Sequence, residues 1–269
     1  MKKRTITAIV VGGSVCCSAF AQQISQQEFH PTKSSNSFVQ SYDASAKLFE
    51  EKDLDSAFET PGLGSLPAAD FDKIVAQIKR PTVIPGASAG NPKESYDIIL
   101  QPGHYLRVNG RTGASGSLVS ERDLMAFLVN RMAHRLSQDG LKVLVVPADG
   151  TAQPLQTKVF LAIHADGNES KCTSGPSLGY AANSSLMPMH AVGWSLARAY
   201  GYDYKQFMKD NLTVNESHYY MFSSIKASAM NGILEVGEIT CDKTEKQLIE
   251  NSERISDNLA TALEFVARM

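Results

Sequence analysis

From residue 96 onward, apolar residues occur in patterns that predict strands alternating with helices. The apolar run 98–100 is followed by apolar residues at helical spacing over 124–136. Ser120 stands before this helical stretch as a cap, and Gly140 follows it as a typical stop. We therefore expect a strand, a loop and a helix between residues 96 and 140.

Five more segments continue this pattern. Short apolar runs over 142–146, 159–163 and 233–239 predict strands, whereas helical spacing over 186–200 and 248–266 predicts helices. Strands that alternate with helices indicate an α/β fold, with a mostly parallel central sheet flanked by helices on both faces. In such folds, functional groups gather at the carboxyl ends of the strands.

Residues 22–95 have a different composition, rich in Gln and Ser at first and later interrupted by Pro and Gly. Two stretches in this segment, 43–58 and 70–79, have helical patterns. The repeated Pro and Gly residues are typical of a linker or of an extended arm lying over a main domain. We expect a partly helical amino-terminal arm over 22–95 and one main domain over 96–269.

The first 21 residues have the parts of a secretory signal peptide. Positive charges at positions 2–4 precede an apolar run over 6–20, and we expect cleavage after Ala21. The run is too short to be a permanent membrane anchor. Cys16 and Cys17 are poor lipid attachment sites because the residue before each is a poor choice at that position. An exported protein is expected, in the periplasm or, alternatively, outside the cell.

Removal of this segment changes the charge and the cysteine content. It takes three of the 26 basic residues, which leaves 23 against 28 acidic residues and a formal charge of −5. A mildly acidic chain without a basic run argues against nucleic acid as a partner. Cys172 and Cys241 remain, and in an oxidising compartment they predict one disulfide, with two buried free thiols as the alternative.

Four side chains suited to metal and proton chemistry stand where such a fold exposes them. His104 and His164 each follow an expected strand, Glu235 lies within one, and Glu121 begins the first expected helix. Each also has an ordinary explanation, as a loop histidine or as a glutamate at the positive end of a helix. Glu235 is harder to explain in this way, because an unpaired carboxylate among apolar neighbours is costly to bury.

Glu238 competes with Glu235, but a spacing of three residues puts their side chains on opposite faces of a strand. Two imidazoles and one carboxylate are a ligand set that leaves zinc a fourth position for water, whose pKa zinc lowers to about 7. A second carboxylate is then needed to move protons. Residue types alone do not assign these roles.

Four short motifs follow one another in a characteristic order. They are Ile-Ile-Leu-Gln-Pro-Gly-His at 98–104, Gly-Ala-Ser-Gly at 113–116 with Glu121 after it, Ala-Ile-His-Ala-Asp at 162–166, and Leu-Glu-Val-Gly at 234–237. Over roughly residues 96–269, this order resembles the zinc-dependent N-acetylmuramoyl-L-alanine amidases, a family of bacterial cell-wall hydrolases. Ala162 and Asp166 depart from the Ser and Asn of the family pattern.

The resemblance implies one Zn²⁺ per chain, with His104, Glu121 and His164 as ligands and Glu235 as the catalytic acid and base. It also implies hydrolysis of the amide between N-acetylmuramic acid and L-alanine, in peptidoglycan or a muropeptide. Two alternatives stay open: a zinc peptidase acting on a peptide amide, and a non-catalytic wall-binding or regulatory domain.

Three further residues are candidates for substrate contact. His218 and Tyr219 lie in a polar and aromatic run before the last expected strand, a composition suited to binding sugar or peptide. Asp166 is the last residue of the motif that contains His164. An unidentified activator also stays open as a partner.

Overall fold

The computed structural model describes residues 66–110, 112–150, 154–181, 184–210 and 213–269. The expected signal peptide and the expected helix over 43–58 lie outside these ranges. In the described part of the chain, no helix is both long enough and apolar enough to cross a membrane.

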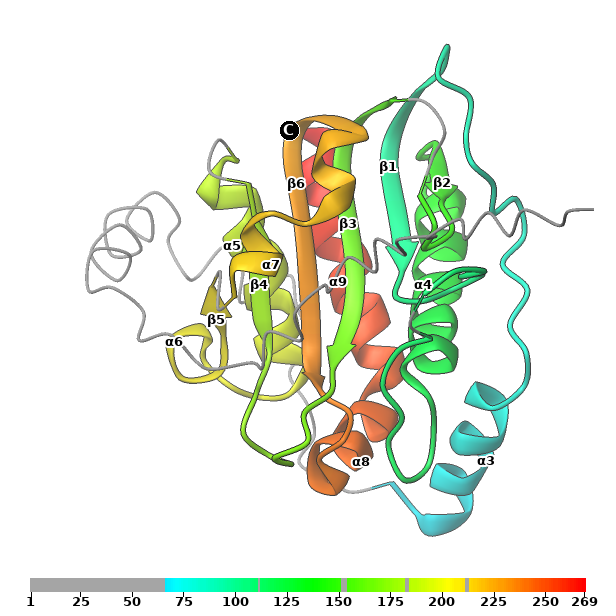
Figure 1. The fold of residues 1–269 in the computed structure, drawn as a ribbon, viewed down its shortest axis with the longest axis vertical. Helices are drawn as coiled ribbons and strands as arrows, with labels where there is room; N and C mark the ends of the chain where they lie inside the picture. The colour runs from blue at the N-terminus through cyan, green and yellow to red at the C-terminus, as the bar shows by residue number, and fades with distance from the viewer. Residues whose placement is uncertain (1–65, 111, 151–153, 182–183, 211–212) are drawn as a thin grey trace, which may run out of the picture. The chain divides into compact units, whose positions relative to one another are not determined.

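A six-stranded sheet forms the centre of the described domain (Figure 1). Its strands, in the order β2-β1-β3-β6-β4-β5, are β2 (Val143–Val145), β1 (Ser95–Pro102), β3 (Leu155–Asp166), β6 (Ile225–Glu238), β4 (Ser177–Tyr180) and β5 (Lys209–Asp210). The first four are parallel to one another, whereas β4 runs antiparallel to β6. The expected α/β fold with a mostly parallel sheet is therefore confirmed.

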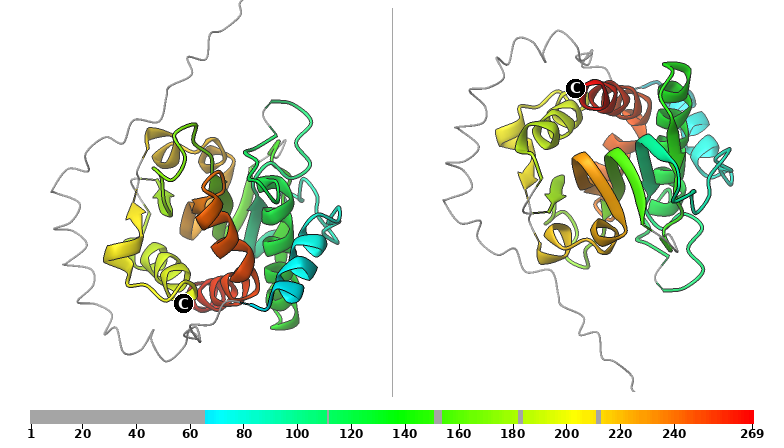
Figure 2. Two further views of the ribbon diagram at one scale, coloured as in Figure 1. Left: turned by 90° about the horizontal axis from the view of Figure 1, so that it is seen from below. Right: turned by 90° about the horizontal axis from the view of Figure 1, so that it is seen from above.

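The longer helices are α3 (Ala68–Ile78), α4 (Glu121–Gln138), α5 (Leu186–Ala199), α8 (Asp242–Glu250) and α9 (Ser252–Arg268). The helices α4, α5 and α9 lie on one face of the sheet (Figures 1 and 2). Ile98 and Leu100 of β1 point to this face, and Ile99 between them points to the other. The second face is covered more thinly, chiefly by the 3-10 helix η2 (Tyr220–Ser223). The helices α6 (Tyr204–Phe207) and α7 (Val214–Ser217) are single turns.

The segment expected to form an arm packs partly into the core. Helix α3 confirms the helix expected over 70–79, and its Ile78 is fully buried. Ile84, beyond the helix, is also buried, and its backbone N–H donates to the hydroxyl of Tyr105, 3.0 Å away. These contacts fix the stretch that enters β1 and, through it, the loop that carries His104.

The carboxyl-terminal stretch differs from the single helix expected over 248–266. It forms two helices that meet at Asn251, whose backbone leaves the helical region with φ −100° and ψ 5°. The side-chain amide of Asn251 donates to the carbonyl of Gln247, 2.8 Å away, at the end of α8. Leu248 and Ile255, seven residues apart, still share the buried face, so the apolar spacing does not reveal the break.

Candidate active site

Three elements bring the expected metal ligands together. His104 lies in the loop after β1, Glu121 is the first residue of α4, and His164 lies near the carboxyl end of β3. One ligand atom from each lies within 4.8 Å of the others. Nε2 of His104 is 3.4 Å from Oε2 of Glu121, and Nδ1 of His164 is 3.0 Å from Oε1.

This donor set fits zinc. Zn–N and Zn–O bonds of about 2.0–2.2 Å in a tetrahedral site put neighbouring ligand atoms roughly 3.3 Å apart. The separation of Nε2 of His104 from Oε2 of Glu121 is 3.4 Å and that of Nδ1 of His164 from Oε1 is 3.0 Å, so each histidine lies close to that distance from one oxygen of the carboxylate. Two imidazole nitrogens and one carboxylate also leave a fourth position for water or substrate, as in catalytic zinc sites.

The backbone holds the Glu121 carboxylate in place. Its Oε2 accepts a hydrogen bond from the N–H of Ala114, and its Oε1 accepts one from the N–H of Ala165. Burial acts to raise the pKa of Glu121, but the hydrogen bond to His164 and the nearby histidine charges outweigh it, so this pKa lies below its usual value. The carboxylate is therefore ionised and aimed at both histidines.

Two glycines make room for this cluster. A Cβ on Gly103 would lie 2.8 Å from Nδ1 of His164, and one on Gly113 would lie 2.8 Å from both Glu121 and the His104 ring. Gly113 also has a left-handed backbone with φ +94°. Because L side chains rarely adopt that conformation, a substitution there adds backbone strain to the clash.

Glu235 stands beside His164 on the neighbouring strand, since the two are register partners between β3 and β6. Its Oε2 is buried and accepts no hydrogen bond from the described residues. Burial, followed by the charges of Asp166, Glu121 and Glu216, raises the pKa of Glu235 well above its usual value. A carboxyl group poised in this way has the properties of a proton carrier.

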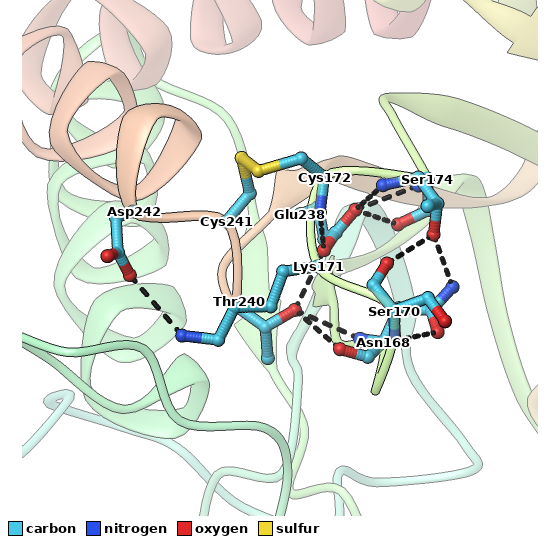
Figure 3. The surroundings of a disulfide bond; sticks show 10 residues. Asn168, Ser170, Lys171, Cys172, Ser174, Glu238, Thr240, Cys241 and Asp242 are labelled. Carbon is cyan, nitrogen blue, oxygen red and sulfur yellow. Dashed lines mark hydrogen bonds and ion pairs between the residues drawn. A yellow bond between two sulfur atoms is a disulfide. The ribbon is translucent and has the colours of Figure 1, made fainter.

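Glu238 has a different position and a different set of partners. It is fully buried and accepts hydrogen bonds from the N–H groups of Cys172, Thr173 and Ser174 (Figure 3). Its oxygens thus anchor the loop after β3, while Glu235 lines the pocket. The expected placement of the two carboxylates on opposite faces of the strand agrees with these contacts.

Cys172 and Cys241 form a disulfide, as expected from the sequence (Figure 3). The bond joins the loop after β3 to the residue that precedes α8. Thr240, next to Cys241, exchanges hydrogen bonds with the backbone of Asn168. The loop is therefore held by covalent and polar contacts close to the ligands.

A pocket of about 540 Å³ contains the three ligands and Glu235. Asp166 and Glu169 also line it, so four carboxylates face this space, and none of its described lining residues is Lys or Arg. Burial, opposed by a hydrogen bond with Ser174, raises the pKa of Asp166 to about 6, and neighbouring carboxylates add to the rise. Such a pocket favours neutral or cationic groups over phosphate-bearing ones.

The candidate substrate contacts have separate positions. Asp166 lines the pocket. His218 is exposed and is not among the residues that line this pocket; its side chain contacts Ser217 and the Val214 carbonyl. Tyr219 lies next to His164, with its hydroxyl 3.1 Å from Nε2 of that histidine. Burial raises the pKa of Tyr219 well above its usual value, so the phenol keeps its proton.

Two buried residues near the site were missed by the sequence interpretation. Gln101 is the second-last residue of β1 and accepts a hydrogen bond from Tyr219. Its one signal in the sequence was a polar residue inside the Leu-Gln-Pro-Gly-His motif. Glu245 of α8 accepts hydrogen bonds from the loop before α4. No local pattern marks Glu245, because its partners lie 126 to 128 residues earlier.

Comparisons with known proteins give likenesses in structure only. No protein-family model and no curated protein matches the chain. The chain is similar to the solved N-acetylmuramoyl-L-alanine amidase AmiC2 of Nostoc punctiforme, with 17% identity and a TM-score of 0.47, over 67% of this chain and 100% of that one. It is also similar to the N-acetylmuramoyl-L-alanine amidase from Clostridium difficile 630, with 14% identity and a TM-score of 0.46, over 64% and 95% of the two chains. A third likeness is to the apo form of the amidase Ami1 from Mycobacterium abscessus, with 14% identity and a TM-score of 0.44, over 65% and 99%.

Proposed function

We propose that this chain is a zinc-dependent amidase that hydrolyses the bond between N-acetylmuramic acid and L-alanine in peptidoglycan. The observation that carries the proposal is the cluster of His104, Glu121 and His164 beside the buried carboxylate of Glu235. The motif order over residues 96–269 supports the choice of substrate. The acidic pocket supports a neutral amide over a phosphate ester.

His104, Glu121 and His164 would hold one Zn²⁺. A bound Zn²⁺ supplies Lewis acidity, which polarises an amide carbonyl and lowers the pKa of water. Glu235 accepts the proton that water loses as the new C–O bond forms. It then delivers a proton to the amine nitrogen as the C–N bond breaks, so the enzyme ends the cycle with the protons it began with.

The raised pKa of Glu235 suits the second half of this cycle, because a carboxyl group that holds its proton firmly is a better acid at neutral pH. The first half requires the ionised form. The positive charge of a Zn²⁺ held by the neighbouring ligands would oppose the negative charge of Glu121 and favour the ionised form of Glu235. The two states therefore alternate at one buried oxygen, Oε2, for which the described residues provide no competing hydrogen bond.

The deciding experiment combines metal analysis with mass spectrometry of fragments released from purified peptidoglycan. We expect one zinc per chain and free stem peptides that begin with L-alanine. Fragments cut between two amino acids would instead identify a zinc peptidase. Zinc binding without any released fragment would favour a non-catalytic wall-binding domain.

Glu235→Gln tests the proton carrier. The variant keeps the shape of the side chain but cannot take up a proton, so we expect full zinc content and a loss of turnover of at least about 100-fold. Glu169→Gln is the matched control, since it makes the same change at an exposed position of the same pocket. Retained activity in the Glu235 variant, or an equal loss in both variants, would reject this role.

His104→Ala tests the ligand set. Removal of one of three ligands should lower zinc content and leave the fold intact, because His104 lies in a loop at the edge of the core. Zinc measured by atomic spectroscopy after dialysis checks this expectation. Full zinc occupancy in the variant would place the metal elsewhere.

We further propose that the protein acts outside the cytoplasm, in the periplasm or beyond the cell. The disulfide between Cys172 and Cys241 supports an oxidising compartment. Determination of the amino terminus of the exported protein tests the proposal, and a mature chain that begins at Gln22 is expected. A cytoplasmic chain that still begins at Met1 would contradict it.

A further inference from the structure

Near the three proposed metal ligands, a carbonyl group fixes the orientation of one buried side chain. Gln101, at the end of β1, is fully buried, and its Nε2 donates to the carbonyl oxygen of Pro147 at 2.9 Å. A carbonyl only accepts hydrogen bonds, so the amide nitrogen must face Pro147. The amide oxygen of Gln101 is then turned toward Tyr219, which lies on the other side.

This orientation determines where the single proton of Tyr219 points. The hydroxyl of Tyr219 donates to Oε1 of Gln101 over 2.7 Å. Because a phenol has one proton, its oxygen presents only lone pairs to other neighbours. One such neighbour is Nε2 of His164, 3.1 Å away, which therefore has to carry a hydrogen and donate it.

The opposite nitrogen of His164 is left without a hydrogen in the neutral ring. This nitrogen, Nδ1, lies 3.0 Å from Oε1 of Glu121, which is itself an acceptor. Two acceptors at this distance repel each other unless a proton or a metal ion lies between them. Nδ1 is therefore the nitrogen that a metal ion would bind.

We propose that Tyr219 and Gln101 are positioning residues that accept the Nε2 hydrogen of His164 and so present its Nδ1 to the metal. The inference rests on the proposed zinc site and assigns to Tyr219 a role other than substrate contact. Buried partners of this kind fix the tautomer and the ring orientation of histidine ligands, and their loss typically lowers metal affinity 10- to 100-fold.

The surroundings of Tyr219 allow a clean substitution. Its ring packs against Tyr220 and Phe222, with ring centres 4.6 and 5.8 Å away. Tyr219→Phe removes the hydroxyl and leaves that packing in place. Tyr96→Phe is the matched control, because the Tyr96 hydroxyl accepts a hydrogen bond from the N–H of Asn91 and Tyr96 lies near the opposite end of β1 from Gln101.

The experiment measures zinc affinity by competition with a chelator and the Nε2–H signal of His164 by ¹⁵N-edited NMR of the zinc-loaded protein. For Tyr219→Phe we expect zinc binding weakened 10- to 100-fold and rapid solvent exchange of the Nε2–H. Tyr96→Phe should match the wild type in both measurements. Gln101→Leu gives a second test, since the Tyr219 proton then turns toward Nε2 and we expect weaker zinc binding although Tyr219 is intact.

Equal zinc affinity and an equally protected Nε2–H in Tyr219→Phe and the wild type would overturn the positioning role while leaving the zinc site standing. A wild type that takes up no zinc would overturn the metal site itself and, with it, this inference. Circular dichroism of each variant establishes that a loss of zinc is not a loss of fold.

Discussion

The carboxylate of Glu245 connects two parts of the chain that are distant in sequence. It is fully buried on α8 and lies against the loop that leads into Glu121. One oxygen accepts hydrogen bonds from the N–H and hydroxyl of Ser117, at 2.8 and 2.7 Å. The other oxygen accepts from the N–H groups of Leu118 and Val119, both at 2.8 Å.

We predict that Glu245→Gln destabilises the protein strongly although it changes only one atom. If the new NH₂ group faces the N–H groups of Leu118 and Val119, two hydrogen bonds are lost. If it faces Ser117, the hydroxyl can turn to accept from it, and one hydrogen bond, from the Ser117 N–H, is lost. Hydrogen bonds to a charged group contribute about 1.5–3 kcal/mol each, so the loss of one or two of them gives an expected destabilisation of about 1.5–6 kcal/mol. The free energy of unfolding of a protein domain is about 5–15 kcal/mol, so this loss is a large share of the total.

Urea unfolding followed by circular dichroism measures this loss. Glu253→Gln is the control on the next helix, because the Glu253 side chain is 58% exposed and its ion pair with Arg131 spans 3.6 Å. Exposed pairs of this kind contribute at most about 1 kcal/mol. An unfolding free energy of Glu245→Gln within about 1 kcal/mol of the wild type, in the range expected of the control, would contradict this prediction.

Two further predictions concern the neighbourhood of the ligands. The pKa of Asp166 rises from 3.8 to about 6 on folding, so its contribution is fully present below pH 3.8 and is lost as the pH rises through about 6. Asp166→Asn should therefore raise the unfolding free energy of the metal-free protein by up to about 3 kcal/mol at pH 7.5 and by much less near pH 4. Urea titrations at both pH values test this prediction, and an equal gain in stability at both would contradict it. The disulfide closes a loop of 69 residues. The double substitution of Cys172 and Cys241 by Ser should lower the free energy of unfolding by about 2–4 kcal/mol in the same assay. An unchanged urea midpoint, or two free thiols in the exported wild type, would rule out that contribution.

The strands and ligands that were predictable from the sequence are those with local signals. The runs that became β1, β3 and β6 are apolar and buried, and His104 and His164 follow or end such runs. Strands β4 and β5 gave no such signal, because Ser177–Tyr180 and Lys209–Asp210 contain no apolar run. A short strand at a sheet edge depends on its partner more than on its own pattern.

The supporting contacts were out of reach for a physical reason. Gln101 and Tyr219 form a hydrogen bond across 118 residues of sequence, and Glu245 meets Val119 across 126. Sequence patterns report which face of an element is buried, and they do not report which distant donor meets which acceptor. The break at Asn251 was hidden for a related reason, since the apolar residues on either side keep one continuous face.

His164 and Glu235 owe their separation to the pairing of β3 with β6. Neighbouring strands lie about 4.8 Å apart in all sheets, because the backbone hydrogen bonds between them determine that length. The distance between His164, a proposed metal ligand, and Glu235, the proposed proton carrier, is therefore independent of the loops that follow these strands. Those loops are free to lengthen, shorten or be exchanged in evolution or by grafting, which would alter what the pocket admits while the reacting groups keep their spacing.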